Sequence, residues 1–365
     1  MDPRRFMLFR VAFSGLPFGE LEAACRRMDA GAEWTPAFER SARELGLLAA
    51  RATREGRRGS AAQAWRWAAS GFHAASLGLH LLGPGLPWRR PTLRLRRLAQ
   101  GAYRRALRLD ASMGQWVRVP TPRGDVGGYL RLPPRGPAPL VVVFNGLDSL
   151  CEVELHAFGD ALLSRGLGVF AADLPAAFGL RPRAPVYAAE EVAPALADWA
   201  ARQPGVLQGR LGAFGVSFGG HMVARALAGD PRFVAGVAVS PNATLDGPLI
   251  GLERMRRMVA LAFDLPEGAA VDALASAIRL EGLEPPEGAL LVMHMEEDRL
   301  FGPEHAVAFL AWGGERVEMR SWQAEHVGTS RVHDWLPLAA DWLHERIHAE
   351  ANTKLTGANS WVATS

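Results

Sequence analysis

A short glycine-containing segment of this sequence has the residue types and spacing of a serine nucleophile. Residues 215–219 read GVSFG, a G-x-S-x-G pattern that follows an apolar run and precedes a helix-like segment. In that context the pattern is typical of a nucleophile elbow, because the flanking glycines let strand and helix pass close together while the serine occupies a strained turn. By itself the pattern also fits an ordinary glycine-rich turn. Ser217 is therefore a candidate nucleophile that needs support from other residues.

A serine nucleophile needs a base, because a free hydroxyl group is a poor nucleophile at neutral pH. After an elbow of this kind the acid comes next along the chain and the histidine last, in a loop beyond the final strand. His326 follows the strand-like run 317–322, as this order requires. We predict that His326 is the base, against the alternative of a surface histidine beside Glu325.

The acid that orients the histidine should follow the preceding strand. The apolar run 290–294 is followed by acidic residues, and Asp298 begins a D-x-x-x-x-P segment that leads into a helix. We predict that Asp298 is the acid, with Glu296 and Glu297 as the rival candidates. The three residues then form a Ser-His-Asp triad.

An oxyanion hole should accompany the triad. One N–H group should come from Phe218, directly after the nucleophile, and a second from the loop after the strand 140–144. In that loop Gly146 lets the backbone approach a substrate closely, so Gly146 or Leu147 is predicted to supply the second N–H group.

Three polar residues lie near the expected pocket and are candidate substrate-binding residues: Asn145, Asp148 and Asp246. The two aspartates also suit a capping role at a helix or turn, which is the more common use of such residues. No pattern in the sequence indicates a cofactor or a metal site, and we predict neither.

The elements around these residues alternate between strand-like and helix-like segments from residue 113 to residue 350. That rhythm predicts an α/β protein with a doubly wound, mostly parallel sheet. Residues 246–284 interrupt it with two helix-like segments, and we interpret them as a lid insertion. Residues 351–365 are polar and patternless and are predicted to be disordered.

Residues 1–112 differ from the rest in pattern and charge. Apolar residues recur at helical spacing, which predicts an all-helical domain. Residues 1–110 hold twenty Arg and nine Asp or Glu, a net charge of +11, so the total of +3 leaves −8 for the remainder. A basic half suggests nucleic acid, but the arginines alternate with Ala and Leu as on a solvated helix face, so we expect no nucleic-acid partner. The aromatic side chains fit either a substrate pocket or, more commonly, a helical core: Trp65, Trp67, Phe72, His73 and Tyr103.

The cysteine content and the apolar runs of the sequence indicate where the protein is located. Two cysteines, Cys25 and Cys151, form no disulfide framework, so a reducing, cytoplasmic location is expected. Arg10 interrupts the apolar run near the N-terminus and no cleavage site follows, which argues against a signal peptide. No uninterrupted apolar stretch is long enough for a transmembrane helix, so no membrane partner is expected.

With these motifs in place, most of residues 35–348 resembles an α/β-hydrolase. The GVSFG elbow, the NGLDS loop at 145–149 and the helical N-terminal part resemble the group that holds FrsA-like esterases, 2,6-dihydroxypseudooxynicotine hydrolase and fungal polyketide-shortening hydrolases. The resemblance implies a helical lid, a homodimer and hydrolysis of β-diketone-like carbon–carbon bonds or of esters. The loop 173–179 departs from the group, which usually has a glycine-rich turn there.

We therefore predict a serine hydrolase that acts on a carbonyl group of a polyketide-like or aromatic small molecule. An acyltransferase or cyclase that uses the same acyl-enzyme is the first alternative, since a lid that excludes water favours it. A non-catalytic binding protein on a hydrolase scaffold is the second.

Overall fold

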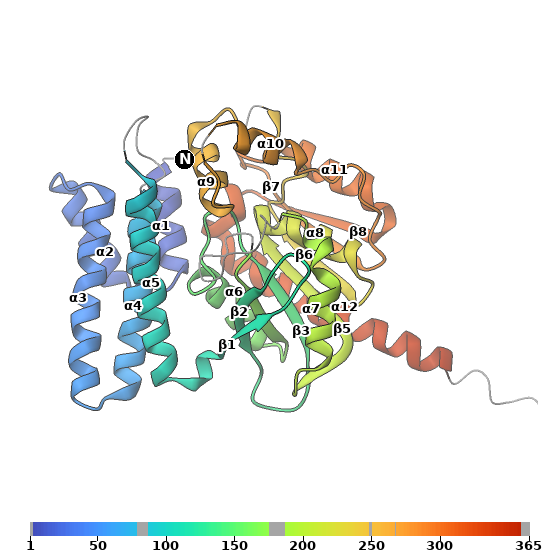
Figure 1. Ribbon diagram of the computed structural model, residues 1–365, viewed down its shortest axis with the longest axis horizontal. Coiled ribbons are helices and arrows are strands. Elements are labelled where there is room, and N and C mark those ends of the chain that lie inside the picture. Colours follow the sequence, from blue (N-terminus) through green and yellow to red (C-terminus); the bar gives the residue numbers. More distant parts are fainter. Residues whose placement is uncertain (1–2, 79–86, 175–186, 248–249, 267, 359–365) are drawn as a thin grey trace, which may run out of the picture.

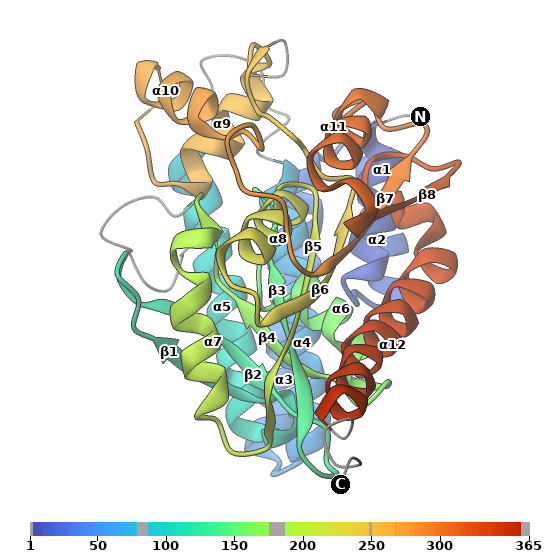
Figure 2. The ribbon, with the colours of Figure 1, turned by 90° about the vertical axis from the view of Figure 1, so that its right-hand side faces the viewer.

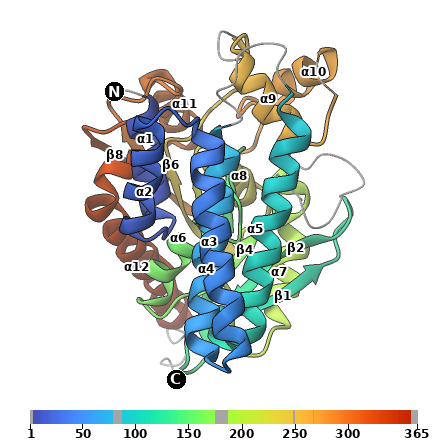
Figure 3. The same cartoon turned by 90° about the vertical axis from the view of Figure 1, so that its left-hand side faces the viewer.

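The computed structural model describes residues 3–78, 87–174, 187–247, 250–266 and 268–358, and their side chains from residue 7 to residue 349. Its N-terminal part is all helical, as predicted (Figure 1). Figure 3 shows these helices standing in front of the sheet. They are α1 (Pro3–Phe13), α2 (Phe18–Asp29), α3 (Trp34–Arg54), α4 (Arg58–Leu77) and α5 (Arg89–Leu109).

An eight-stranded sheet forms the centre of the rest of the chain. Its order is β1-β2-β4-β3-β5-β6-β7-β8. The pairs β1–β2 and β2–β4 are antiparallel and all later pairs are parallel. The strands are β1 (Gln115–Val119), β2 (Val126–Arg131), β3 (Ala138–Phe144), β4 (Gly168–Ala172), β5 (Val206–Val216), β6 (Phe233–Val239), β7 (Ala289–Met295) and β8 (Val317–Trp322).

The central strands are buried on both faces, and alternate side chains enter two different cores. In β3, Val141 and Val143 join the core on the side of the helical bundle. Their neighbours Leu140 and Val142 join the core on the opposite side. Successive side chains of a strand point to opposite faces, so the uninterrupted apolar run of β3 follows from its position in the middle of a covered sheet.

Helices cover both faces, which confirms the α/β-hydrolase expectation of a sheet between helical layers (Figure 2). Aromatic and aliphatic side chains of α6 (Glu154–Leu163) and α12 (Val332–Ala358) pack in the same core as α1–α5. Apolar side chains of α7 (Ala193–Ala201), α8 (Phe218–Gly229) and α11 (Pro303–Gly313) pack on the other face. Within the described residues, no helix combines the length and hydropathy needed to cross a bilayer.

Two segments differ from a plain alternation of strands and helices. The predicted insertion contains α9 (Glu253–Ala262) and α10 (Ala269–Ala277), which lie over one end of the sheet (Figure 2). Helix α12 continues to Ala358, so residues 351–358 of the segment predicted to be disordered are helical in the structure. Residues 359–365 lie outside the described residues.

Candidate active site

Ser217 lies at the sharp turn between β5 and α8. Its backbone has φ 56° and ψ −126°, a strained conformation for a residue with a side chain. The elbow depends on its two glycines. A Cβ atom on Gly215 would lie 2.2 Å from the carbonyl oxygen of Gly219, and one on Gly219 would lie 2.5 Å from that of Phe144. Strand, turn and helix therefore pack too closely for any larger residue at either position.

The structure brings Ser217, His326 and Asp298 together in one hydrogen-bonded chain. Nε2 of His326 lies 3.0 Å from Oγ of Ser217, and Nδ1 of His326 lies 2.7 Å from Oδ2 of Asp298. The Asp298 side chain is 1% exposed and that of His326 is 12% exposed. The rivals Glu296 and Glu297 are exposed at the surface. The arrangement suits removal of a proton from the serine hydroxyl group.

Asp298 is held as a carboxylate by its surroundings. Burial raises its pKa, but the His326 imidazole and hydrogen bonds from the N–H groups of Leu300 and Phe301 outweigh that effect, so the pKa lies below its ordinary value. A carboxylate that accepts these bonds keeps one oxygen atom directed at Nδ1 of His326. It thereby fixes the orientation of the ring.

A strained backbone also positions His326. The following residue, Val327, has φ 67°, which is unusual for a β-branched residue. Its N–H group donates a hydrogen bond to Oγ of Ser240, 2.9 Å away. The next carbonyl group, that of Gly328, accepts a hydrogen bond from the indole nitrogen of Trp335. Both contacts hold the two residues that directly follow His326.

Backbone N–H groups suited to an oxyanion hole lie directly after Ser217 and in the adjacent loop. In the described part of the chain, the N–H groups of Gly146 and Leu147 have no hydrogen-bond acceptor. The N–H group of Phe218 lies in the first turn of α8, where intrahelical acceptors are lacking. A Cβ atom on Gly146 would lie 3.6 Å from Cβ of Ser217, so the loop approaches the nucleophile closely. The positions therefore suit the role predicted for Phe218, Gly146 and Leu147.

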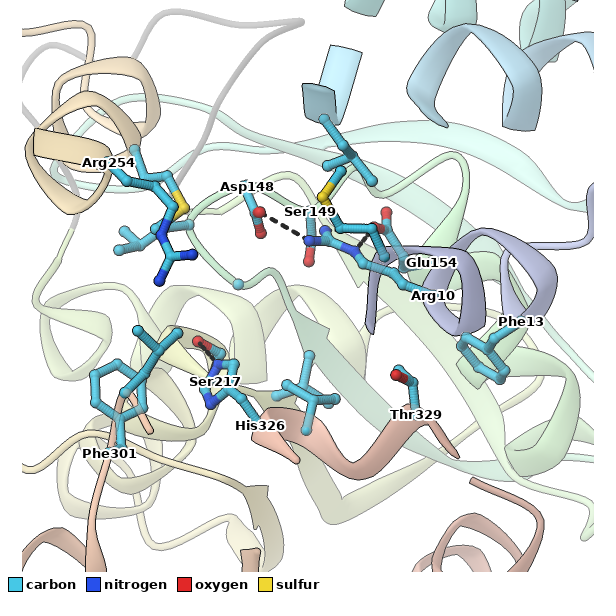
Figure 4. Close-up of a pocket in the computed structure, with 18 of the residues that line it drawn as sticks. Arg10, Phe13, Asp148, Ser149, Glu154, Ser217, Arg254, Phe301, His326 and Thr329 are labelled. Atoms are coloured by element: carbon cyan, nitrogen blue, oxygen red, sulfur yellow. Dashed lines mark hydrogen bonds and ion pairs between the residues drawn. The ribbon is translucent and has the colours of Figure 1, made fainter. Parts of the chain in front are cut away.

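A pocket opens above Ser217 and His326, and most of its lining is apolar (Figure 4). The lining comes from both the helical part and the sheet's loops. Helix α1 contributes Met7, Arg10 and Phe13, and helix α9 contributes Arg254, Met255 and Met258. The remaining residues are Leu77, Gly146, Leu147, Asp148, Ser149, Glu154, Phe158, Val216, Leu300, Phe301, Val327 and Thr329.

Arg10 joins the helical part to the loop beneath the pocket. Its Nη1 atom donates to Asp148 at 2.7 Å, and its Nη2 atom donates to Glu154 at 2.6 Å. Glu154 also contacts Nε2 of His73 at 2.7 Å and accepts from the N–H group of Leu150. Burial raises the pKa of Glu154, but His73, Arg10 and the backbone bond outweigh it and lower the pKa to about 2.

A second arginine from the helical part holds the same loop. Nη2 of Arg96 donates to the carbonyl oxygen of Asp148 at 2.7 Å. Burial lowers the pKa of Arg96 to about 10, and the nearby Asp148 and Glu154 act against that effect. At neutral pH the side chain remains charged. Two arginines of the bundle therefore bracket the loop that carries the candidate oxyanion groups.

Two residues predicted to bind substrate do not line the pocket. Asn145 is fully buried, and its side-chain nitrogen lies 3.5 Å from the carbonyl oxygen of Ala172 in β4, so it faces the sheet. Asp246 interacts with Thr244 and Arg279 near the surface. Asp148 does line the pocket, where it is paired with Arg10. Most of the divergent loop 173–179 lies outside the described residues.

The bundle's aromatic residues serve as core rather than as pocket lining. Phe72, His73 and Tyr103 are buried, while Trp65 and Trp67 pack at the edge of the same core. None of the five is among the residues that line the pocket. Across the described ranges, no group of three or more His, Cys, Asp or Glu side chains could hold a metal, and both cysteines are free.

Helix α1 and helix α9 contribute pocket residues that no motif in the sequence marks. Residues 6–13 read FMLFRVAF, an apolar run that Arg10 alone interrupts. A single arginine in an apolar run predicts a carboxylate partner, because a cation that is buried without one is costly. No local signal separates Arg254 from the other arginines of 253–257.

Comparisons with known proteins bear on the family and the fold of the chain. The model of the family described as esterase FrsA-like matches residues 31–259. No curated protein matches the sequence. Among solved structures, 2,6-dihydroxy-pseudo-oxynicotine hydrolase is similar with a TM-score of 0.80 and 17% identity, over 94% of this chain and 96% of the other.

Two further structures are similar in fold. AbyA5 has a TM-score of 0.62 and 15% identity, over 89% of this chain and 92% of its own. Est1E from Butyrivibrio proteoclasticus, solved with ferulic acid, has a TM-score of 0.50 and 17% identity, over 64% of this chain and 99% of its own. At these identities the likeness concerns the fold alone. The first two structures extend over the helical part as well as the sheet.

Proposed function

Because the chain belongs to the FrsA-like esterase family of α/β-hydrolases, we propose that it is a serine hydrolase whose triad is Ser217, His326 and Asp298. The observation that carries the proposal is the hydrogen-bonded chain from Asp298 through His326 to Ser217, which ends at the floor of a largely apolar pocket. The substrate is a small carbonyl compound with an apolar body.

In the first half of the reaction, Oγ of Ser217 attacks the carbonyl carbon atom while Nε2 of His326 takes its proton. Asp298 stabilises the imidazolium ion that forms. The negative charge that develops on the substrate oxygen atom is stabilised by the N–H group of Phe218 and by that of Gly146 or Leu147. His326 then gives its proton to the leaving group, and an acyl-enzyme remains.

In the second half, a water molecule takes the place of the leaving group. His326 removes a proton from the water as it attacks the acyl carbon atom, and it returns that proton to Oγ of Ser217. A free carboxylic acid is released. The same N–H groups serve both steps, since the oxyanion forms at the same atom.

The bond that is cut is either an ester or a carbon–carbon bond. An ester has an oxygen leaving group that His326 protonates directly. A carbon–carbon bond leaves a carbanion, so the substrate needs a second carbonyl group that delocalises the charge, as in a β-diketone. We propose polyketide-like or aromatic substrates of these two kinds, because apolar side chains predominate around the pocket.

Product analysis tests the proposal and separates the reactions. The protein is incubated with an aryl ester, 4-nitrophenyl butyrate, and with a β-diketone, 1-phenyl-1,3-butanedione, in water enriched in ¹⁸O. A hydrolase releases a free acid that carries ¹⁸O, and Ser217→Ala releases none. A transferred or cyclised product without free acid would contradict hydrolysis and favour an acyltransferase or cyclase.

A further inference from the structure

Arg254 enters the pocket from the insertion rather than from the sheet. It lies in the first turn of α9, and its side chain is half-buried. It lines the same pocket as Ser217 and His326. Figure 4 shows its side chain descending from α9 on the side of Phe301, while Arg10 enters from α1.

Neighbouring arginines on α9 have acidic partners, whereas Arg254 has none among the described residues. Arg256 pairs with Asp272, and Arg257 pairs with Glu253, 3.0 Å away. Among the residues that the structure describes, no side chain or carbonyl group accepts a hydrogen bond from Arg254, and no carboxylate lies within ion-pair distance of it. Its guanidinium group therefore offers donors to whatever occupies the pocket.

The other charges around the pocket are matched with each other. Arg10 contacts both carboxylates of the lining, Asp148 and Glu154. Arg96 lies behind Asp148 and donates to its carbonyl oxygen atom. Two arginines thus accompany two carboxylates, and Asp298 faces His326. Within the described part of the chain, Arg254 is the pocket arginine that has no carboxylate partner.

The lining residues that α9 and the loop of Asp298 contribute besides Arg254 are apolar. Met255 and Met258 come from its own helix, and Leu300 and Phe301 come from the loop that carries Asp298. A charged group beside such surface gains most from a partner of opposite charge, because apolar neighbours offer it no hydrogen bonds. A ligand that fits this environment has an apolar body and an anionic group.

We propose that Arg254 binds a carboxylate group of the substrate, so that the protein acts on carbonyl compounds that carry an acid function away from the reacting carbon atom. This inference rests on the proposed function in placing the substrate's carbonyl group at Ser217. The planar guanidinium group binds a carboxylate with two parallel hydrogen bonds. Arg254 then determines which end of the substrate faces the triad.

Binding of matched acid and amide pairs tests the proposal without catalysis. Isothermal titration calorimetry on Ser217→Ala compares 4-phenylbutyrate with 4-phenylbutanamide, and hexanoate with hexanamide. Each acid should bind about tenfold more tightly than its amide, since a hydrogen-bonded ion pair replaces a neutral hydrogen bond. With Arg254→Gln added, the two affinities should become equal within about twofold, and Arg254→Lys should keep part of the preference.

Arg256→Gln is the matched control, because it removes an arginine of the same helix that lies outside the pocket. It should keep the full preference for the acid, and circular dichroism checks that each variant is folded. Equal affinities for acid and amide in the Ser217→Ala protein, no detectable binding of either acid, or an unchanged preference in Arg254→Gln would overturn the proposal. Failure of the ¹⁸O experiment would contradict the proposed function and leave this binding result standing.

Discussion

The guanidinium group of Arg10, in the first helix, lies 2.7 Å from the carboxylate of Asp148, in the loop after β3. This ion pair joins the N-terminal helical part to the loop that carries Gly146 and Leu147, which approaches Ser217 closely. Arg10 also contacts Glu154, at the start of α6. The helical part therefore covers the pocket and also binds the loop after β3, which forms part of the pocket wall.

Removing Arg10 should destabilise the protein strongly. Arg10→Met leaves the carboxylates of Asp148 and Glu154 without their cation in a mostly buried site, and the expected loss in the free energy of unfolding is about 3 kcal/mol. Urea denaturation measures it. The matched control is Arg26→Met, which breaks an exposed pair with Glu22 and should cost under about 1 kcal/mol. Equal losses in the two variants would contradict this account.

The low pKa of Glu154 predicts a pH-dependent contribution to stability. Its folded pKa is about 2, below the ordinary value of 4.5. The carboxylate therefore stabilises the fold above about pH 4.5, and this contribution is lost as the pH falls toward about 2. Between those values the difference in unfolding free energy between wild type and Glu154→Gln should shrink by about 3 kcal/mol. Urea titrations at several pH values measure it, and a constant difference would show that Glu154 has no such role.

The choice of acid can be tested by exchanging carboxylates for amides. Asp298→Asn keeps the shape of the side chain but removes the charge that stabilises the His326 imidazolium, so kcat should fall by about 10³- to 10⁴-fold. Glu296→Gln and Glu297→Gln alter exposed residues and should leave kcat unchanged. Steady-state kinetics with 4-nitrophenyl butyrate provide the comparison. A large loss in either glutamate variant would reassign the acid.

The strain at Ser217 predicts that its inactive glycine variant is more stable than its inactive alanine variant. At φ 56° and ψ −126° a side chain costs about 1–3 kcal/mol, which glycine avoids. Glycine loses about 0.5–1 kcal/mol through its greater freedom when unfolded. Ser217→Gly should therefore be more stable than Ser217→Ala by about 1 kcal/mol, as measured by urea denaturation. A more stable alanine variant would indicate that the elbow is not strained.

The sheet and the arrangement of Ser217, Asp298 and His326 were predictable because local patterns determine them. A buried parallel strand is a continuous apolar run, as in 140–144, and the elbow needs glycines at fixed distances from the serine. The expected chain order of serine, acid and histidine then places the acid and the histidine in the loops after β7 and β8. These signals are local in the sequence, although the residues they mark, such as Ser217 and His326, meet across 109 positions.

The pocket walls were less predictable because they depend on how distant elements pack. Asn145 follows a strand directly, yet its side chain faces β4 rather than the pocket. Helix α1 has little amphipathic pattern of its own, and its position depends on the pairing of Arg10 with carboxylates more than 130 residues away in sequence. Such contacts leave no local periodicity in the sequence.

The most direct test of the central claim is covalent labelling of the nucleophile. The folded protein is treated with a fluorophosphonate, and its intact mass and tryptic peptides are measured before and after. An activated serine attacks the phosphorus atom and displaces fluoride, so wild type should gain a single adduct located on Ser217, and Ser217→Ala should gain none. A wild-type protein that remains unlabelled, or an adduct that persists in Ser217→Ala, would contradict the assignment of Ser217 as the nucleophile of a serine hydrolase.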